Sequence, residues 1–136
     1  MRRPLIAASV LVLAASLLTA CASGEHARTD FSHQRYQAKV HYDSLALMSV
    51  VGIRDINVDR GEGFPRVQAT VVNHSFFSKN FEYQIQWVDS SGFVVNPGSQ
   101  PWIPLHLRGH ESRPVQSTAP NADAQDFTIH VRKQDS

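Results

Sequence analysis

An alternation of apolar and polar side chains from Phe81 to Asp89 limits the possible folds of this chain more than any other feature. Successive side chains of an extended strand point to opposite faces, so residues two apart share a face. Polar Glu82, Gln84 and Gln86 fall on one face. The pattern predicts a half-buried β-strand whose other face forms the middle of a core. The core residues expected there are Phe81, Tyr83, Ile85 and Trp87.

Similar but shorter patterns occur elsewhere between about Val40 and the end of the chain. A three-residue step from Ile53 to Ile56 interrupts one of them and predicts a β-bulge. Phe127 and Ile129 alternate with polar residues and are expected in the same core. About seven short strands, separated by turns and without a helical period, favour an all-β, antiparallel sandwich. The further segments expected to be extended are 50–58, 66–73, 93–95, 102–107, 112–118 and 127–131.

The first 20 residues have the pattern of an export leader. Arg2 and Arg3 precede an apolar run from Leu5 to Ala20, which is 16 residues long. A helix needs about 20 apolar residues to cross a bilayer, so a membrane span is the weaker interpretation. A buried core helix is also disfavoured by the charged residues directly before the run.

The leader ends in a motif, Leu18-Thr19-Ala20-Cys21, that resembles a bacterial lipobox. This resemblance implies that Cys21 becomes the first mature residue and carries a diacylglycerol thioether and an acylated amine. Several acyl chains are needed for lasting attachment to a membrane. No Asp follows Cys21, which resembles lipoproteins sorted to the outer membrane. The alternative is an ordinary secretory signal with a chance cysteine.

We therefore expect three segments: a leader over 1–20, a lipidated flexible tether over 21–39, and a β-sandwich domain over 40–136. Because Cys21 is the only cysteine, the domain has no disulfide and depends on its core. Without Arg2 and Arg3, 11 basic side chains face 12 acidic ones, a net charge of −1. This balance gives no electrostatic footprint for nucleic acid.

No arrangement of residues indicates catalysis or metal binding. His106 and His110 have the spacing of two metal ligands on a helix, but Pro104 and Gly109 place them in a strand and turn. Asp89 and Asp126 are better explained by a turn and a strand start than by a catalytic pair, and no G-x-S-x-G motif is present. We expect no catalytic residue, no metal and no cofactor apart from the lipid on Cys21.

Two positions are candidates for contact with a partner. Phe76 and Phe77 are adjacent in a polar segment, Asn73–Asn80, and two neighbours on an extended chain cannot both point inward. One of them is then exposed, unless the segment folds over the sandwich and buries both. Trp102, between two prolines, is the second candidate. Trp87, Tyr83 and Trp102 could instead stack on a sugar, although alternation favours the core for the first two.

The lipobox and several spaced residues resemble the YcfL-like lipoproteins of Gram-negative bacteria. The resemblance implies an immunoglobulin- or fibronectin-like sandwich facing the periplasm from the outer membrane, with no assigned function and no established functional residues. Genes of this family often lie near that of a lipoprotein activator of a penicillin-binding protein, an association with cell-wall synthesis. The residues that carry it are Val71-Val72-Asn73, Tyr83-x-Ile85-x-Trp87-x-Asp89-x-x-Gly92, Trp102 and Asp126-Phe127-x-Ile129-x-Val131-Arg132.

The expected function is binding without catalysis. The partner we expect is a protein of the cell envelope, reached from a lipid anchor on the periplasmic face of the outer membrane. An alternative is a module that binds peptidoglycan or another carbohydrate. An envelope hydrolase is the weakest alternative.

Overall fold

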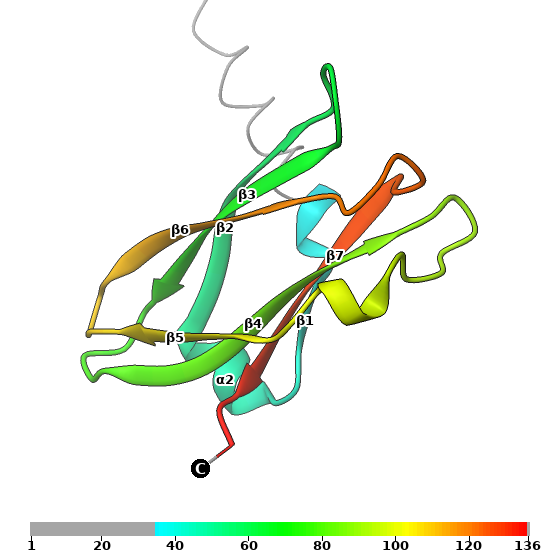
Figure 1. The fold of residues 1–136 in the computed structure, drawn as a ribbon. Coiled ribbons are helices and arrows are strands. Elements are labelled where there is room, and N and C mark those ends of the chain that lie inside the picture. The colour runs from blue at the N-terminus through cyan, green and yellow to red at the C-terminus, as the bar shows by residue number, and fades with distance from the viewer. Residues whose placement is uncertain (1–34, 136) are drawn as a thin grey trace, which may run out of the picture.

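The computed structural model describes residues 35–135, and Figure 1 shows that strands dominate this part of the chain. The elements are β1 (Val40–Tyr42), α2 (Leu45–Val50), β2 (Val51–Asp59), β3 (Arg66–Asn73), β4 (Lys79–Val88), η1 (Pro97–Ser99), β5 (Ile103–Leu107), β6 (Ser112–Thr118) and β7 (Asp126–Lys133). The predicted leader and lipobox, from Met1 to Cys21, lie outside the described residues. Between residues 35 and 135, no helix is long and apolar enough to cross a bilayer.

Within residues 35–135, seven strands form two sheets, which confirms the predicted β-sandwich. One sheet has the order β1-β7-β4-β5 and the other β2-β3-β6. The sheets are not entirely antiparallel, because β1 runs parallel to β7. Sequence periodicity assigns residues to faces but carries no information on strand direction, so it could not reveal this pairing.

Strand neighbours follow the immunoglobulin arrangement. In that fold, strands A, B and E are neighbours in one sheet, and C′, C, F and G in the other. Here β2, β3 and β6 take the first three places, and β5, β4 and β7 take the places of C′, C and F. The short strand β1 lies where strand G would be, but it is parallel to its neighbour. Trp87, on β4, occupies the strand that carries the buried tryptophan of immunoglobulin domains.

The predicted core is confirmed. Trp87, Phe81, Phe127 and Ile129 are fully buried, and Tyr83 and Ile85 are nearly so. The rings of Trp87 and Phe127, which are paired across β4 and β7, have centroids 5.9 Å apart. Tilted aromatic pairs at this distance add to the free energy gained from burial.

The sheet edges are poorly suited to pairing with another chain. In β2, the register shifts between Arg54 and Asn57, and Asp55 has a φ of 51°, which confirms the predicted bulge. The edge strands β5 and β6 contain Pro104 and Pro114, each of which removes a backbone donor. Bulges and prolines at edges prevent strand addition.

Helix α2 was not predicted. Ser44 caps it, with its hydroxyl accepting from the amide of Leu47 at 3.2 Å. Leu47 is its one buried residue, whereas Leu45 and Met48 are exposed. Six residues with one buried side chain show no helical period. The expected extended segment at 93–95 is also reduced to a single bridge between Val88 and Val94.

Contacts with the sandwich begin before Val40, within the segment assigned to the tether. The ring centroid of Tyr36 lies 5.9 Å from that of Phe127. The Gln37 side chain donates to the carbonyl of Ile53 at 2.7 Å. Lys39 forms an ion pair with Asp126. The folded domain therefore includes at least residues 36–39.

Candidate contact surfaces

The loop between β3 and β4, residues 74–78, presents both candidate phenylalanines to solvent. Phe76 is 84% exposed and Phe77 is 76% exposed. The sequence argument predicted that at least one of the two side chains is exposed, unless the segment folds over the sandwich. Figure 1 shows this loop beside the β5–β6 turn, at one end of the sandwich. We call residues 74–78 the aromatic loop.

A fully buried amide holds the aromatic loop in place. Asn73, the last residue of β3, has no exposed surface. Its Nδ2 donates to the carbonyl oxygens of Phe77 at 2.8 Å, Arg108 at 2.9 Å and Leu107 at 3.2 Å. A single side chain thus joins the aromatic loop to the end of β5 and the turn that follows. Buried polar groups with satisfied hydrogen bonds restrict a segment to one conformation.

The other end of the Asn73 amide organises the start of the loop. Its Oδ1 accepts from the Ser75 amide at 3.0 Å, an Asx turn. The Ser75 hydroxyl lies 2.8 Å from both Oδ1 of Asn73 and the carbonyl oxygen of Phe77. The sequence signal for this arrangement is Asn73-x-Ser75 at a strand end, but neither the burial of Asn73 nor its three carbonyl partners could be inferred from it.

The β5–β6 turn fits against the aromatic loop from the other side. A Cβ atom on Gly109 would lie 2.1 Å from the carbonyl oxygen of Phe76, so only glycine fits there. The next residue, His110, donates its amide to the carbonyl of Ser75 at 3.1 Å and has a φ of 60°. Its ring meets that of Phe76 edge-on, with centroids 4.7 Å apart. These contacts fix the backbone on both sides of Phe76.

A carboxylate beside the aromatic loop is held by two hydrogen bonds. The Glu111 carboxylate accepts from the Arg108 amide and from the Arg113 guanidinium, each at 2.7 Å. The bond from the Arg108 amide and, next in size of effect, the bond from Arg113 lower the pKa of Glu111. One ion pair, between Glu111 and Arg113, therefore lies near the two phenylalanines.

Two more exposed apolar residues lie on α2, at the same end of the sheets. Val51, which follows α2, pairs with Asn73, and the His74 amide donates to the carbonyl of Val50 at 2.7 Å. Leu45 is 79% exposed and Met48 54%. This end of the domain thus carries four exposed apolar side chains.

Trp102 lies elsewhere, on the outer face of the β1-β7-β4-β5 sheet, and its ring is covered. The guanidinium carbon of Arg132 is 4.1 Å from the ring centroid, and Arg132 also pairs with Glu82 at 2.6 Å. This cation–π contact stabilises the position of the indole ring. A sugar could stack on this side of Trp102 only by displacing Arg132.

Two histidines stack on the same outer face. His41 on β1 and His130 on β7 are register partners, with ring centroids 5.0 Å apart. Burial, followed by the charge of His41, lowers the pKa of His130. Because burial and a neighbouring cation both disfavour the charged ring, this pair is most stable with His130 neutral.

The other residues considered for chemistry remain separate. His106 binds the side chain of Asn80 at 2.6 Å, whereas His110 contacts Phe76. Asp89 accepts from the amides of its own turn. Asp126 starts β7 and pairs with Lys39. Burial opposes the charge of Asp126, but the Lys39 and backbone hydrogen bonds outweigh it and lower its pKa. Within residues 35–135, no group of three potential ligands could hold a metal ion.

Comparison with known proteins gives a family but no activity. A family model described as a protein of unknown function (DUF1425) matches residues 37–133. No curated protein matches the chain. The crystal structure of a DUF1425 family member from Shewanella sp. pv-4, at 1.81 Å resolution, is 27% identical, with a TM-score of 0.57 over 63% of this chain and 80% of that one. Campylobacter jejuni cj0090 shares the fold at 19% identity, with a TM-score of 0.53 over 71% of this chain and 98% of its own. The chain described here thus belongs to the DUF1425 family.

Proposed function

We propose that this protein is a lipid-anchored binding domain that uses the aromatic loop to contact another protein of the cell envelope. The observation that carries the proposal is the exposure of Phe76 and Phe77 on a loop whose backbone is held by the buried Asn73. Exposed aromatic residues are common anchors of protein interfaces. A loop already fixed in one conformation loses little entropy when it binds.

The energetics favour a partner that covers the two rings. Removing a phenylalanine side chain from water gains about 1.5–3 kcal/mol. Phe76 and Phe77 are nearly fully exposed, so the domain itself gains little of this free energy. The protected edges of both sheets disfavour strand addition as the mode of contact. Contact through side chains of the loop is the better-supported mode.

Sequence features supply the location of the proposed interaction. The leader over 1–20 and Cys21 support export and lipid attachment, and the Ala22-Ser23 pair supports the outer membrane. The finer resemblance to the YcfL-like lipoproteins supports the same location and an association with cell-wall synthesis. We include no catalytic role in this proposal.

Changing both phenylalanines to serine is expected to remove the partner. We expect the double variant, Phe76→Ser with Phe77→Ser, to fold normally, because both side chains are exposed. Covalent crosslinking in cells that make the full chain should then capture at least about tenfold less of the specific partner than the wild type does.

A matched control is Phe93→Ser. Phe93 is 73% exposed but follows β4, whereas the aromatic loop precedes that strand. This variant should leave the crosslinked partner unchanged. Equal capture of the partner by the double variant and the wild type would remove the aromatic loop from the proposal.

Changing Cys21→Ala is expected to abolish lipid attachment. The thiol is the atom that would carry diacylglycerol, and alanine offers no nucleophile in its place. Cells fed a radioactive fatty acid should label the wild-type protein but not the variant, which should accumulate uncleaved or leave the membrane fraction. Label on the variant would show that Cys21 is not the lipid site.

A further inference from the structure

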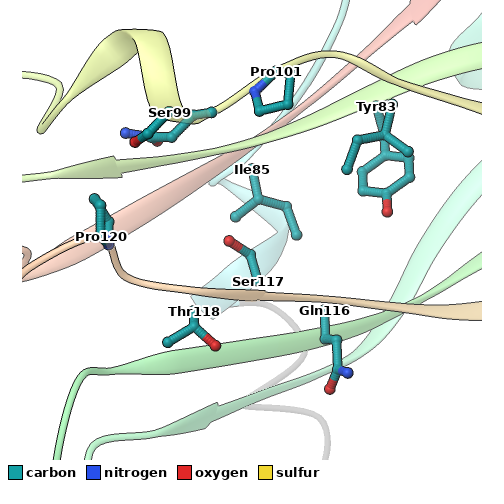
Figure 2. A pocket seen from close by; sticks show the side chains of 10 residues that line it. Tyr83, Ile85, Ser99, Pro101, Gln116, Ser117, Thr118 and Pro120 are labelled. Atoms are coloured by element: carbon teal, nitrogen blue, oxygen red, sulfur yellow. The ribbon is translucent and has the colours of Figure 1, made fainter.

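A cavity of about 170 Å³ lies between the two sheets, where β5 and β6 form the open side of the sandwich. Figure 2 shows Tyr83 and Ile85 entering it from β4, with Ser117 opposite them on β6. Pro101 and Pro120 close it at the loops. A water molecule occupies about 30 Å³ in the liquid, so the cavity holds on the order of five waters or one small chemical group.

The cavity is lined by a tyrosine hydroxyl without a protein partner. Tyr83 is only 7% exposed, and its ring belongs to the predicted core. Figure 2 shows the phenolic oxygen directed toward the gap between the sheets. The hydroxyl makes no hydrogen bond with any residue from 35 to 135. Since no fully buried side-chain oxygen in this range lacks a partner, the Tyr83 oxygen is open to the cavity. Burial raises the pKa of Tyr83, so the hydroxyl keeps its proton and can donate.

A second hydroxyl faces it from the other sheet. The Ser117 oxygen accepts from Nε1 of Trp87 at 2.9 Å, which leaves the Ser117 proton to be donated elsewhere. Figure 2 shows the Ser117 side chain pointing toward Ile85, across the cavity. Tyr83 and Ser117 are therefore two donors on opposite walls. A carbonyl oxygen can accept from Tyr83, and a second oxygen of the same ligand can accept from Ser117.

The remaining walls determine what can carry that carbonyl. Ile85, Ile103 and the two prolines provide apolar contacts suited to a methyl group. Among the described residues that line the cavity, none except Tyr83 can ionise. A charged ligand would lose its hydration with no opposite charge to replace it, and a pure hydrocarbon would leave the Tyr83 hydroxyl unpaired. A neutral group with a carbonyl and a methyl fits both requirements.

The rim of the cavity favours a sugar over a peptide. Ser99 and Gln100, both neutral, lie at one side of the opening, whereas Figure 2 shows the side chains of Gln116 and Thr118 directed away from it. The Gln100 side chain is itself fixed, since it accepts from the Trp87 amide and donates to the carbonyl of Val95. A peptide would pair with the strands at the opening, but β5 and β6 each contain a proline.

We propose that this cavity binds the acetamido group of a neutral amino sugar. The carbonyl oxygen accepts from Tyr83, a sugar oxygen accepts from Ser117, the methyl lies against Ile85 and Ile103, and the other sugar hydroxyls meet Ser99 at the rim. This site is separate from the aromatic loop, so it stands or fails independently of the partner proposed above.

The test is a titration of the full mature chain, labelled with ¹⁵N and held in detergent micelles, with di-N-acetylchitobiose. Amide signals of Tyr83, Ile85, Ile103 and Ser117 should shift together. Cellobiose, which is neutral and of similar size but has hydroxyls in place of the acetamido groups, should not shift them. A disaccharide of N-acetylglucosamine and N-acetylmuramic acid tests the cell-wall source: tighter binding than chitobiose assigns the site to that glycan, and equal binding assigns it to acetamido sugars in general.

Changing Tyr83→Phe removes one donor and keeps the core volume, and it should weaken binding about fivefold, the usual effect of one hydrogen bond. The same change at half-buried Tyr36, outside the cavity, should leave binding unaffected. Equal affinity for cellobiose, unchanged affinity in Tyr83→Phe, or no shifts at the cavity would overturn the proposal. Shifts produced by an N-acetylated tripeptide but not by the sugar would also overturn it, in favour of a peptide site.

Discussion

Truncating Trp87 to alanine is expected to lower the free energy of unfolding by about 4 kcal/mol, the usual cost of removing a buried aromatic side chain. Trp87 is fully buried, packs against Phe127 and donates its indole proton to Ser117. The variant loses the transfer free energy of the indole and leaves a cavity between the sheets. Domains of this size have a total stability of about 5–15 kcal/mol, so the loss is a large fraction of the total.

Urea denaturation, followed by far-ultraviolet circular dichroism, measures this loss as a lower midpoint with an unchanged slope. Trp102→Ala is the matched control, because it removes the same side chain from the outer face of the same sheet. There the loss is mainly that of the contact with Arg132, about 0.5–1 kcal/mol. If Trp102→Ala cost as much as Trp87→Ala, the core would not be centred on β4.

Strands with one buried face were predictable because their signal is local. The period of two from Phe81 to Trp87 identifies the buried face of β4 without any knowledge of its neighbours. For β3 and β6, the predicted bounds, 66–73 and 112–118, agree with the structure. The bulge was also predictable, because an extra residue breaks the period where it occurs, at Arg54-Asp55.

Features that depend on distant contacts could not be predicted. The three residues of β1 are too few to show a period, and their parallel direction is set by pairing with β7. Residues 36–39 are polar or small apart from Tyr36, so their composition resembled a linker. Their contacts are with Ile53, Asp126 and Phe127, all far away in sequence.

Only part of the candidate contact surface could be predicted from the sequence. Adjacent Phe76 and Phe77 implied that one ring is exposed, because neighbours on a strand face opposite ways. Exposure of both follows from the turn that Asn73 imposes, through bonds to residues 34 and 35 positions away. The unpartnered hydroxyl of Tyr83 was also invisible to periodicity, which correctly assigned its ring to the core but could not show the gap beside it.

Replacing Asn73 with aspartate is expected to destabilise the domain by about 3 kcal/mol and to release the aromatic loop. The change keeps the shape of the side chain but replaces Nδ2, which lies within hydrogen-bond distance of three carbonyl oxygens, with a carboxylate oxygen. Three carbonyl oxygens lose their donor, and a negative charge is buried beside them. Each unsatisfied buried group costs about 1–3 kcal/mol. Urea denaturation at neutral pH provides the measurement.

The pH dependence of this variant separates its cause from general misfolding. Burial among carbonyl oxygens raises the pKa of an introduced aspartate above its unfolded value. The folded state then binds more protons than the unfolded state, so the variant should recover stability as the pH falls toward 5, when the carboxyl becomes neutral and can donate. Asn80→Asp, the same change at an exposed residue of β4, should alter stability by less than about 0.5 kcal/mol.

The same variant connects the loop's rigidity to its proposed binding. Asn73→Asp leaves Phe76 and Phe77 in the sequence but removes the amide that holds them in place. If a fixed loop is what makes the two rings a contact site, crosslinking to the partner should fall in Asn73→Asp at temperatures where the sandwich is still folded, and should not fall in Asn80→Asp. Full crosslinking by a destabilised Asn73→Asp would show that the rings bind without the fixed backbone, and preorganisation would then have no part in the interaction.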